Sequence, residues 1–432
     1  MVDTLLQKPA SWLDAEGPEA AVAVWSQCSL VRNLGDFAFP PSCTDEEKQA
    51  VEERVLGALD SLHLLATGGY CEMNQITPTE VDFIAEHRFI PVELARGAAH
   101  AGVYIADDQS SGIAVNGSDH LCLTMLASGL ELQHLWTRLR ALDDTLASAL
   151  DYAFDTRYGF LTASLAHVGT GLKASVILHL PALTMGNGIT PLVQTARQRR
   201  QAIHGMKPVV LSGVPRMPRM LHPLPPPSVR RERTTRTDAS DAASADAASA
   251  STRSAEATEA FYYDLTGALY GDVSEAQGDL YLLTNLATLG APEEEILFHL
   301  RRTAAEIIAQ ERTAREALLQ KERKRIEDRV WRALGVARTA RLLGFTEAVS
   351  LLSSLRLGID AGLLRGYSLK DLNELLLASQ SAHLKIKAGA RPGRDGRPGR
   401  ADAASAECDE YTLSMERADL FRARFARVGE GA

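Results

Sequence analysis

One interruption of the globular pattern decides how this chain can fold. Residues 213–257 begin with a cluster of prolines and continue through arginine-rich and then alanine-, serine- and aspartate-rich sequence that holds almost no large apolar side chain. Such a segment cannot bury enough apolar surface to offset the entropy lost on ordering. Globular patterning resumes at Phe261. We therefore expect a disordered insertion at 213–257, inside a domain built from both flanks.

The part of the chain before the insertion predicts mixed α and β structure. Short apolar runs such as 102–105 and 112–115 alternate with helical patterns up to about residue 205. Thr44 and Glu47 have the spacing of a capping box, which marks the start of an amphipathic helix over 47–62.

The part after the insertion predicts mostly helices. Pro292 suits the first turn of a helix, and large apolar residues follow at the spacing of one helical face: Ile296, Leu300, Ile307 and Ile308. Further helices are expected through Leu364, over 369–379 and near 411–428. Residues 388–406 are rich in Gly, Pro, Arg, Ala and Asp, which predicts a mobile low-complexity loop.

Composition limits the class of protein. The 432 residues are enough for two or more domains, and 45% hydrophobic with 23% charged residues is typical of a folded soluble protein. A net charge of -9 argues against a nucleic-acid partner, because nucleic-acid binders concentrate Lys and Arg. No run approaches the roughly 20 apolar residues that span a bilayer, which predicts no membrane association.

The cysteines and the first residues predict a cytoplasmic location. The five cysteines are widely spaced and form no CxxC pair, so the sequence predicts neither a metal site nor a disulfide framework. Free thiols suit a reducing cytosol. The N-terminal residues lack the basic region and apolar core of a secretory signal.

A specific resemblance lies in residues 151–183, DYAFDTRYGFLTASLAHVGTGLKASVILHLPAL. This segment resembles the signature region of bacterial protein-arginine kinases (McsB type), which belong with creatine and arginine kinases among the ATP:guanido phosphotransferases, or phosphagen kinases. Supporting similarities follow the family's order at 31–40, 119–120, 270–285 and 351–364.

The resemblance implies an α+β fold in two domains. A phosphagen-kinase-like catalytic domain, built on an antiparallel sheet flanked by helices, would cover 1–290, and a small all-helical C-terminal domain would cover 291–432. The implied reaction transfers the γ-phosphoryl group of ATP, with Mg, to an arginine guanidinium in a protein. A carboxylate pair must orient the guanidinium and accept a proton, while arginines and the metal neutralise the triphosphate.

Several charged positions of the family pattern are replaced in this chain. The family's Ser-Arg-x-Arg stretch, whose arginines grip phosphates, is here Ser26-Gln27-Cys28-Ser29, although Arg32 and Asn33 are kept. The family's Asn-Glu-Glu-Asp-His-Leu-Arg, which carries a catalytic glutamate and another phosphate-binding arginine, is here NGSDHLC over 116–122.

Further family positions provide the candidate site residues. An arginine that follows the glycine turn 169–172 is replaced by Lys173, which keeps the charge but loses the bidentate fork. The second catalytic glutamate is shortened to Asp272, the predicted catalytic residue. The resemblance implies an ATP cleft at Ser26, Lys173, Ala174, Ser175, Val176, Ile177 and Gly271. Arg417, in a partial match to the family's Arg-Asp-x-x-Arg-Ala, is the implied phosphoarginine-binding residue.

Each candidate also has a structural interpretation. Lys173 can be a solvated surface lysine, and Asp272 a carboxylate that stabilises a turn. Asp119 and His120 are expected to support the fold. We also expect structural roles for two other histidines, His167 and His179. The arginines at 230–236 can steer an acidic partner or simply solubilise the chain.

Three functions remain open from the sequence. The first is a catalytically impaired pseudokinase that regulates or scaffolds other proteins, with a role in protein quality control. It follows from the replaced positions, because losing one preorganised transition-state donor costs about 10² to 10³ in rate. The second is an active phosphotransferase that uses Lys173 for phosphate, Asp272 as base, and Arg88 or Arg157 as further phosphate ligands. The third is a binding module for arginine-phosphorylated proteins. The resemblance also implies a homodimer, a protein substrate or client, and a small zinc-binding adaptor protein.

Overall fold

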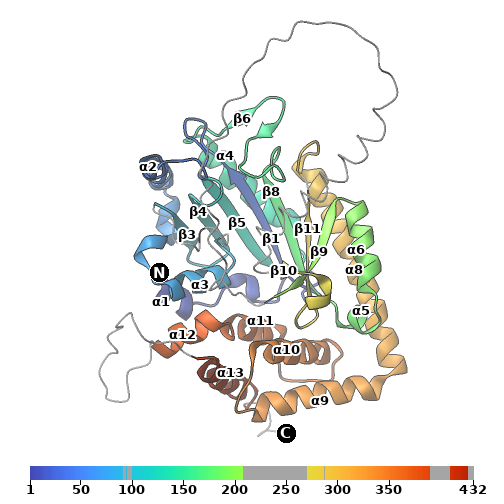
Figure 1. Ribbon diagram of the computed structural model, residues 1–432. Coiled ribbons are helices and arrows are strands. Elements are labelled where there is room, and N and C mark those ends of the chain that lie inside the picture. The colour runs from blue at the N-terminus through green and yellow to red at the C-terminus, as the bar shows by residue number, and fades with distance from the viewer. Residues whose placement is uncertain (91–93, 95–99, 208–269, 287, 390–408, 427–432) are drawn as a thin grey trace, which may run out of the picture.

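The computed structural model describes residues 1–90, 94, 100–207, 270–286, 288–389 and 409–426 (Figure 1). The predicted insertion at 213–257 and nearly all of the predicted loop at 388–406 lie outside the described residues. Within them, the main feature is a nine-stranded sheet in the order β10-β9-β11-β8-β1-β5-β4-β3-β2, in which every pairing is antiparallel.

The nine strands are β1 Ala23–Arg32, β2 Gly68–Glu72, β3 Gly102–Ala106, β4 Ser111–Val115, β5 Leu121–Ser128, β8 Leu172–His179, β9 Gln201–Met206, β10 Tyr270–Gly271 and β11 Leu280–Asn285. A separate hairpin pairs β6 Phe154–Asp155 with β7 Gly159–Phe160. The runs predicted as strands at 102–105 and 112–115 are confirmed as β3 and β4.

Helices precede, connect and follow these strands. Those of the first part are α1 Val2–Gln7, α2 Asp45–Ser61, α3 Pro78–Glu86, α4 Leu132–Ala147, α5 Pro181–Met185 and α6 Ile189–Gln198. Those of the second part are α8 Glu293–Lys321, α9 Arg323–Thr339, α10 Phe345–Asp360, α11 Leu369–Ala378, α12 Ser381–Gly389 and α13 Glu410–Phe425. Short 3-10 helices include η1 Ser11–Leu13, η2 Leu64–Thr67, η3 Met73–Gln75 and η5 Val273–Glu275.

Local sequence signals explain where the main helices begin. The side chain of Thr44 accepts from the backbone of Glu47, and Glu47 bonds back to the Thr44 backbone, which confirms the predicted capping box at the start of α2. Pro292 is the N-cap of α8 and not a residue of its first turn, so that detail of the prediction is wrong. The fixed φ of proline suits an extended N-cap equally well.

Alternation along the strands gives the sheet two different faces. Residues such as Leu30, Val176 and Leu283 point to one face, which we call the covered face, where α2, α4, α6 and α8 pack on it. On the opposite face, Ile177 and Leu282 pack with C-terminal helices through residues such as Leu352. The sheet and the helices on both sides form an α+β fold.

Helix α8 links the two parts of the chain. Its apolar residues from Ile296 to Ile308 belong to the core of the covered face. Figure 1 shows α8 along one side of the sheet and the helices from α9 onward below it. The predicted domain boundary at residue 290 stays a prediction.

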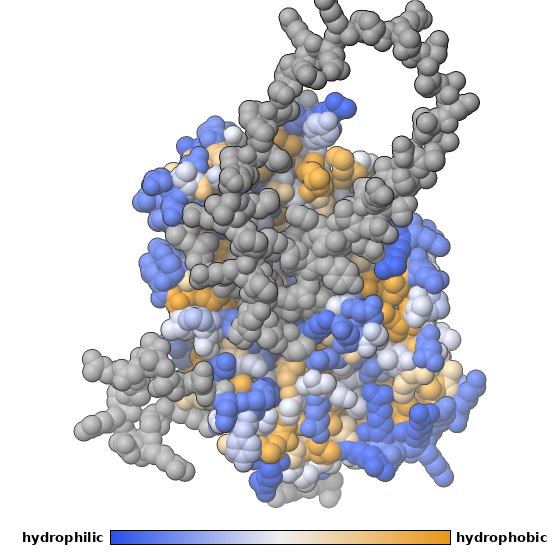
Figure 2. All heavy atoms as spheres, in the orientation of Figure 1, coloured by the Kyte–Doolittle hydropathy of each residue, from blue (hydrophilic) through white to orange (hydrophobic). Residues whose placement is uncertain are grey.

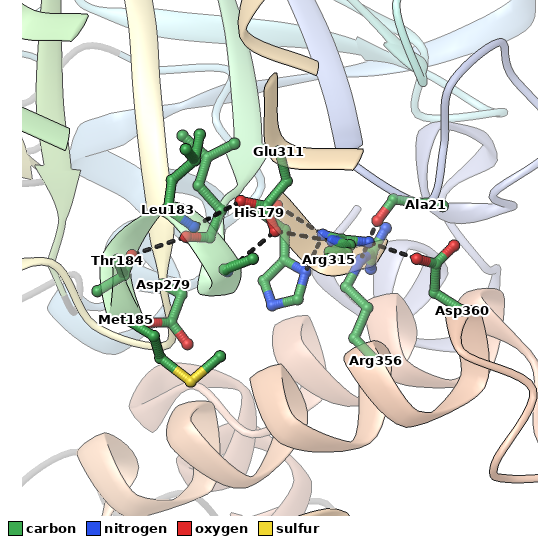
Figure 3. Close-up of polar contacts among 12 residues, drawn as sticks. Ala21, His179, Leu183, Thr184, Met185, Asp279, Glu311, Arg315, Arg356 and Asp360 are labelled. Carbon is green, nitrogen blue, oxygen red and sulfur yellow. Dashed lines mark hydrogen bonds and ion pairs between the residues drawn. The ribbon is translucent and has the colours of Figure 1, made fainter. Parts of the chain in front are cut away.

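A network of buried polar side chains connects the C-terminal helices to the sheet by hydrogen bonds and ion pairs (Figure 3). We call the following residues the sheet–helix network: His179, Asp279, Glu311, Arg315, Ser353, Arg356 and Asp360. Arg315 lies at its centre and donates to Glu311 Oε1 at 2.7 Å, to Asp360 Oδ2 at 2.7 Å and to the His179 carbonyl at 2.9 Å. Both Arg315 and Glu311 are almost fully buried, with side-chain exposures of 4% and 0%. The predicted structural role of His179 agrees with this position.

Arg356 makes the second set of bonds across the same interface. Its guanidinium donates to the carbonyl oxygens of Ala20 and Ala21, which precede β1, and to Asn373 Oδ1 at 2.6 Å. Asn373 in turn donates to the Leu13 carbonyl at 3.1 Å. The N-terminal segment is therefore bonded to helices α10 and α11.

Candidate functional site

The positions at which the resemblance implies phosphate-binding arginines lie together on the side of the sheet opposite the covered face. In the register of β1 and β8, Gln27 is opposite Ser175, and Ser29 is opposite Lys173. Directly opposed residues of antiparallel strands point to the same face. These side chains occupy the part of that face beyond the packed C-terminal helices, and we call this part the polar face.

Strand β5 adds two more side chains to the polar face. Ser29 is opposite Thr124, and Cys122 lies two residues along the same strand. Their side chains bond to one another: Ser29 Oγ is 2.8 Å from Thr124 Oγ1, Cys122 Sγ is 3.7 Å from the same oxygen, and Gln27 Nε2 donates to Ser29 Oγ at 3.4 Å. The face is therefore lined by neutral groups that are partly satisfied among themselves.

Lys173 is the cation of this face. Among the described residues of β1, β5, β8 and β11 that point to it, Lys173 is the only lysine or arginine. Its side chain is half-buried. Burial raises the pKa of Asp119, and the positive charge of Lys173 opposes that shift. Burial and the same charge together lower the pKa of His167. Lys173 thus lies close enough to influence both groups.

The turn that leads into Lys173 requires glycine. Gly171 has a φ of +69°, and a Cβ there would lie 2.5 Å from the Val31 carbonyl oxygen. The Arg32 side chain holds this turn, because it donates to the Thr170 carbonyl at 2.8 Å and to Asp143 Oδ2 at 2.7 Å. Its guanidinium also lies 3.6 Å from the centre of the Phe160 ring. The retained Arg32 has a structural role here.

Asp119 and His120 hold the neighbouring loop, in agreement with the expected support of the fold. Asp119 Oδ1 accepts from Asn33 Nδ2 and from the Ala163 backbone, both at 2.7 Å. His120 Nδ1 accepts from the Leu34 backbone at 3.0 Å, and burial lowers the pKa of His120 to about 4. His120 is therefore neutral at pH 7 and serves as a hydrogen-bonded core residue.

The residues of the predicted ATP cleft divide between the two faces. Ser26, Ala174 and Val176 point to the covered face, where Ser26 Oγ donates to the Gly129 carbonyl at 2.7 Å. Ile177 points the other way but packs in the core with the C-terminal helices. Of the predicted residues in β1 and β8, only Lys173 and Ser175 bring side chains to the polar face.

Gly271 and Asp272 lie at the edge of the sheet, away from Lys173. Gly271 ends β10, which is three strands from β8, or roughly 14 Å across the sheet. Register places Gly271 in the row of Leu178, roughly 17 Å along β8 from Lys173. Asp272 caps η5 and accepts from Ser274 N at 2.8 Å and Ser274 Oγ at 2.6 Å, which lowers its pKa. Its catalytic role stays a prediction, and its observed contacts stabilise a turn.

Arg417 is fully buried in the C-terminal helices. It donates to the Ser379 carbonyl and to the Leu343 carbonyl, both at 2.9 Å, and joins α13 to the rest of this region. The predicted phosphoarginine binding stays a prediction.

The sequence patterns did not identify Thr124, which bonds to two residues of the polar face. A usable signal existed, because Thr124 follows Cys122 at the period of two that keeps side chains on one face of a strand.

The polar face does not fit a magnesium triphosphate. Charge-assisted bonds from several cations normally compensate the phosphates, and among the described strand residues that point to this face Lys173 is the only cation. Across the described part of the chain, no group of three or more His, Cys, Asp or Glu side chains is placed to hold a metal ion. We therefore assign no reaction step to ATP at this face.

Comparisons with known proteins agree on one family. The model of the ATP:guanido phosphotransferase C-terminal catalytic domain matches residues 50–211 and 255–314, and the model of the protein-arginine kinase McsB C-terminal domain matches residues 323–430. The protein-arginine kinase of Moorella thermoacetica is 30% identical over 387 residues, which cover 89% of this chain and 93% of that protein.

Two further similarities complete the comparison. The protein-arginine kinase of Brevibacillus brevis is 31% identical over 398 residues, covering 91% of this chain and 93% of that protein. The crystal structure of lombricine kinase aligns with 71% of each chain at 19% identity and a TM-score of 0.46. In the described residues, no helix is both long and apolar enough to cross a membrane.

Proposed function

This chain belongs to the protein-arginine kinase family of ATP:guanido phosphotransferases, and from this premise we propose that it is a pseudokinase, a member that has lost ordinary phosphoryl transfer and regulates or scaffolds other proteins. Protein-arginine kinases act on protein substrates. We infer that this chain keeps a protein partner and not the reaction.

One observation carries the proposal. The positions where the family pattern has phosphate-binding arginines, Gln27, Ser29, Cys122 and Lys173, meet on one face, and one of the four keeps a positive charge. Loss of a single preorganised donor costs about 10² to 10³ in rate, and these losses act on the same triphosphate. Ordinary kinase rates are therefore not expected.

Two measurements test the proposal together. Calorimetric titration of the purified chain with MgATP is expected to show no binding, and an acid-labile phosphoarginine assay on a generic protein substrate is expected to show no turnover. A variant that restores arginine at Gln27, Ser29, Cys122 and Lys173 is the matched comparison and is expected to bind MgATP. Turnover of the unmodified chain at ordinary enzyme rates would contradict the proposal.

The active-enzyme alternative depends on Lys173, which remains partly exposed on the polar face. It predicts that Lys173→Ala abolishes ATP-dependent labelling, and unchanged labelling would count against it. The other groups lie apart. Arg88 is 7% exposed, with its guanidinium 5.9 Å from the centre of the Trp25 ring, and Arg157 is exposed in the β6–β7 turn beside Tyr158. Because Arg88 and Arg157 do not lie with Lys173, this arrangement supports the pseudokinase proposal over the active-enzyme alternative.

The remaining expectations from the resemblance belong to the same proposal. They are a homodimer, a small zinc-binding adaptor as partner and a role in protein quality control. The cytoplasmic location, which was expected from the cysteines and the N-terminal residues, is proposed with them. Among the described cysteines, Cys28, Cys43, Cys71 and Cys122 are free thiols, as a reducing compartment requires. Light scattering measures the homodimer directly, and copurification with a zinc-containing protein tests the adaptor.

A further inference from the structure

A cavity of about 480 Å³ lies between the N-terminal segment and the C-terminal helices. Its walls come from residues within 5–13, from the loops that carry His87 and Gln109, and from helices α11, α12 and α13. Figure 1 shows α1 and α3 above α12, and Figure 2 shows hydrophobic residues at the surface near α1 with hydrophilic residues around them. Cavities of roughly 300 to 1,000 Å³ are typical of sites for drug-sized ligands.

Hydrogen bonds fix the walls of this cavity. Gln109 Nε2 donates to the carbonyl oxygens of Leu5 at 3.2 Å and of Lys8 at 2.8 Å, which attaches the N-terminal segment to the turn between β3 and β4. On the other side, Glu86 at the end of α3 accepts from Ala382 N at 2.9 Å, which attaches α12. The fold itself therefore sets the shape of the cavity.

The inner lining of the cavity is largely neutral. Half of its lining residues are apolar, namely four leucines, two alanines and a proline. The two histidines of the lining, His87 and His383, are buried, and burial lowers the pKa of each to about 3. Both rings are therefore uncharged at pH 7. Such a lining favours a ligand whose body is apolar.

The charges around the cavity are mostly positive. Lys8, Lys387 and Arg424 face a single carboxylate of the lining, that of Glu374. Arg424 Nη2 donates to Glu374 Oε2 at 3.0 Å, and Lys8 Nζ lies 3.4 Å from Asp107 Oδ2. Lys387 is exposed near the end of α12 and forms no ion pair with any other residue that the structure describes. A lysine in this position favours an anionic group at the opening of the cavity.

We propose that this cavity binds a small organic carboxylate with an apolar body, whose carboxylate pairs with Lys387 while the body fills the space between the leucines. The proposal goes beyond the proposed function and does not depend on it. Arg417, the implied phosphoarginine-binding residue, does not line the cavity, because its bonds to the Ser379 and Leu343 carbonyls place it elsewhere among the C-terminal helices. A ligand in the cavity contacts both the N-terminal segment and the C-terminal helices and so stabilises their packing.

Calorimetric titration of the full chain with three probes tests the chemistry of the ligand. Naphthoate carries an apolar ring system and a carboxylate, naphthylmethylammonium carries the same rings with a positive charge, and inorganic phosphate is an anion without an apolar body. Naphthoate is expected to bind, and the other two probes are not. Absence of naphthoate binding overturns the proposal, as does equally tight binding of either other probe.

Two variants test the place of binding. Lys387→Glu should weaken naphthoate binding by at least about tenfold, because repulsion replaces a charge-assisted bond. Ala378→Trp fills the cavity with a large side chain and should abolish binding while circular dichroism shows that the fold is kept. The matched control is Lys324→Glu, at an exposed lysine on α9 that does not line the cavity, and it should leave the affinity unchanged.

The outcomes of these variants are decisive in both directions. Affinity of Lys387→Glu equal to that of the parent chain overturns the proposal, whether or not Ala378→Trp folds. Equal weakening by Lys324→Glu also overturns it, because naphthoate would then respond only to the net charge of the protein. A folded Ala378→Trp variant that still binds naphthoate places the ligand outside the cavity. The pseudokinase proposal is tested by MgATP binding and arginine turnover, so the two proposals can fail separately.

Discussion

Removing the carboxylate of Glu311 is expected to destabilise the fold strongly. Its two oxygens accept from Ala182 N at 3.0 Å, from Leu183 N at 2.9 Å and from Arg315 Nε at 2.7 Å. In Glu311→Ala, both backbone donors at the start of α5 lose their acceptor, and the buried Arg315 keeps Asp360 as its partly exposed counter-charge. Breaking a buried pair from one side costs about 3 to 5 kcal/mol, so the free energy of unfolding should fall by that amount.

The same helix offers the control. Glu306 also bonds an arginine four residues away, with Arg302 Nε at 3.0 Å, and accepts from Arg199 Nη1 at 2.7 Å, but its side chain is 38% exposed. Glu306→Ala should cost less than about 1 kcal/mol, because water screens an exposed pair. Urea unfolding of both variants, followed by circular dichroism, gives the comparison. If Glu311→Ala costs no more than Glu306→Ala, the assignment of the sheet–helix network as a stabilising element is refuted.

Two further predictions concern backbone strain and pH. Gly171→Ala should lower the free energy of unfolding by about 1 to 3 kcal/mol, since φ is +69° there. Gly57→Ala, in the middle of α2 with open space around the added Cβ, should raise it by about 0.5 to 1 kcal/mol. Thermal unfolding measures both variants, and equal effects would contradict this reasoning. Burial lowers the pKa of His87 to about 3. Between about pH 6.5 and 3 the imidazole is therefore protonated in the unfolded chain but not in the folded one. The free energy of unfolding consequently falls as the pH falls, by up to about 1.4 kcal/mol per pH unit. His87→Phe should flatten this slope relative to the parent chain. Glu86 contributes an opposite slope, because burial raises its pKa to about 8, but this contribution cancels when the two proteins are compared. Identical pH profiles would contradict the assignment.

Elements with local signals could be predicted from the sequence, and long-range polar contacts could not. The capping box of Thr44 and the one-sided apolar pattern from Ile296 to Ile308 both appear in the fold. The pair Glu311–Arg315 has the same spacing in sequence as the exposed pair Arg302–Glu306. Only the tertiary packing of α8 on one side decides which pair is buried.

The candidate site could likewise be predicted from the sequence only in part. Motif comparison selected replaced positions of β1, β5 and β8 that meet on one face of the sheet. It also grouped Ser26, Ala174 and Val176 with Lys173, although alternation along a strand puts them on opposite faces. The exposure of Leu165 and Leu289 gave no signal in sequence, because it depends on how separate loops meet.

The bonds of Arg356 have a consequence for synthesis on the ribosome. This residue and Asn373 hold the carbonyl groups of Ala20 and Leu13, which are separated from them by 336 and 360 positions in the chain. The segment before the central strand β1 cannot reach its final bonds until most of the polypeptide has emerged. Contacts so distant in sequence slow folding and leave apolar surface exposed meanwhile. The nascent chain is therefore expected to mature after translation and not domain by domain during it.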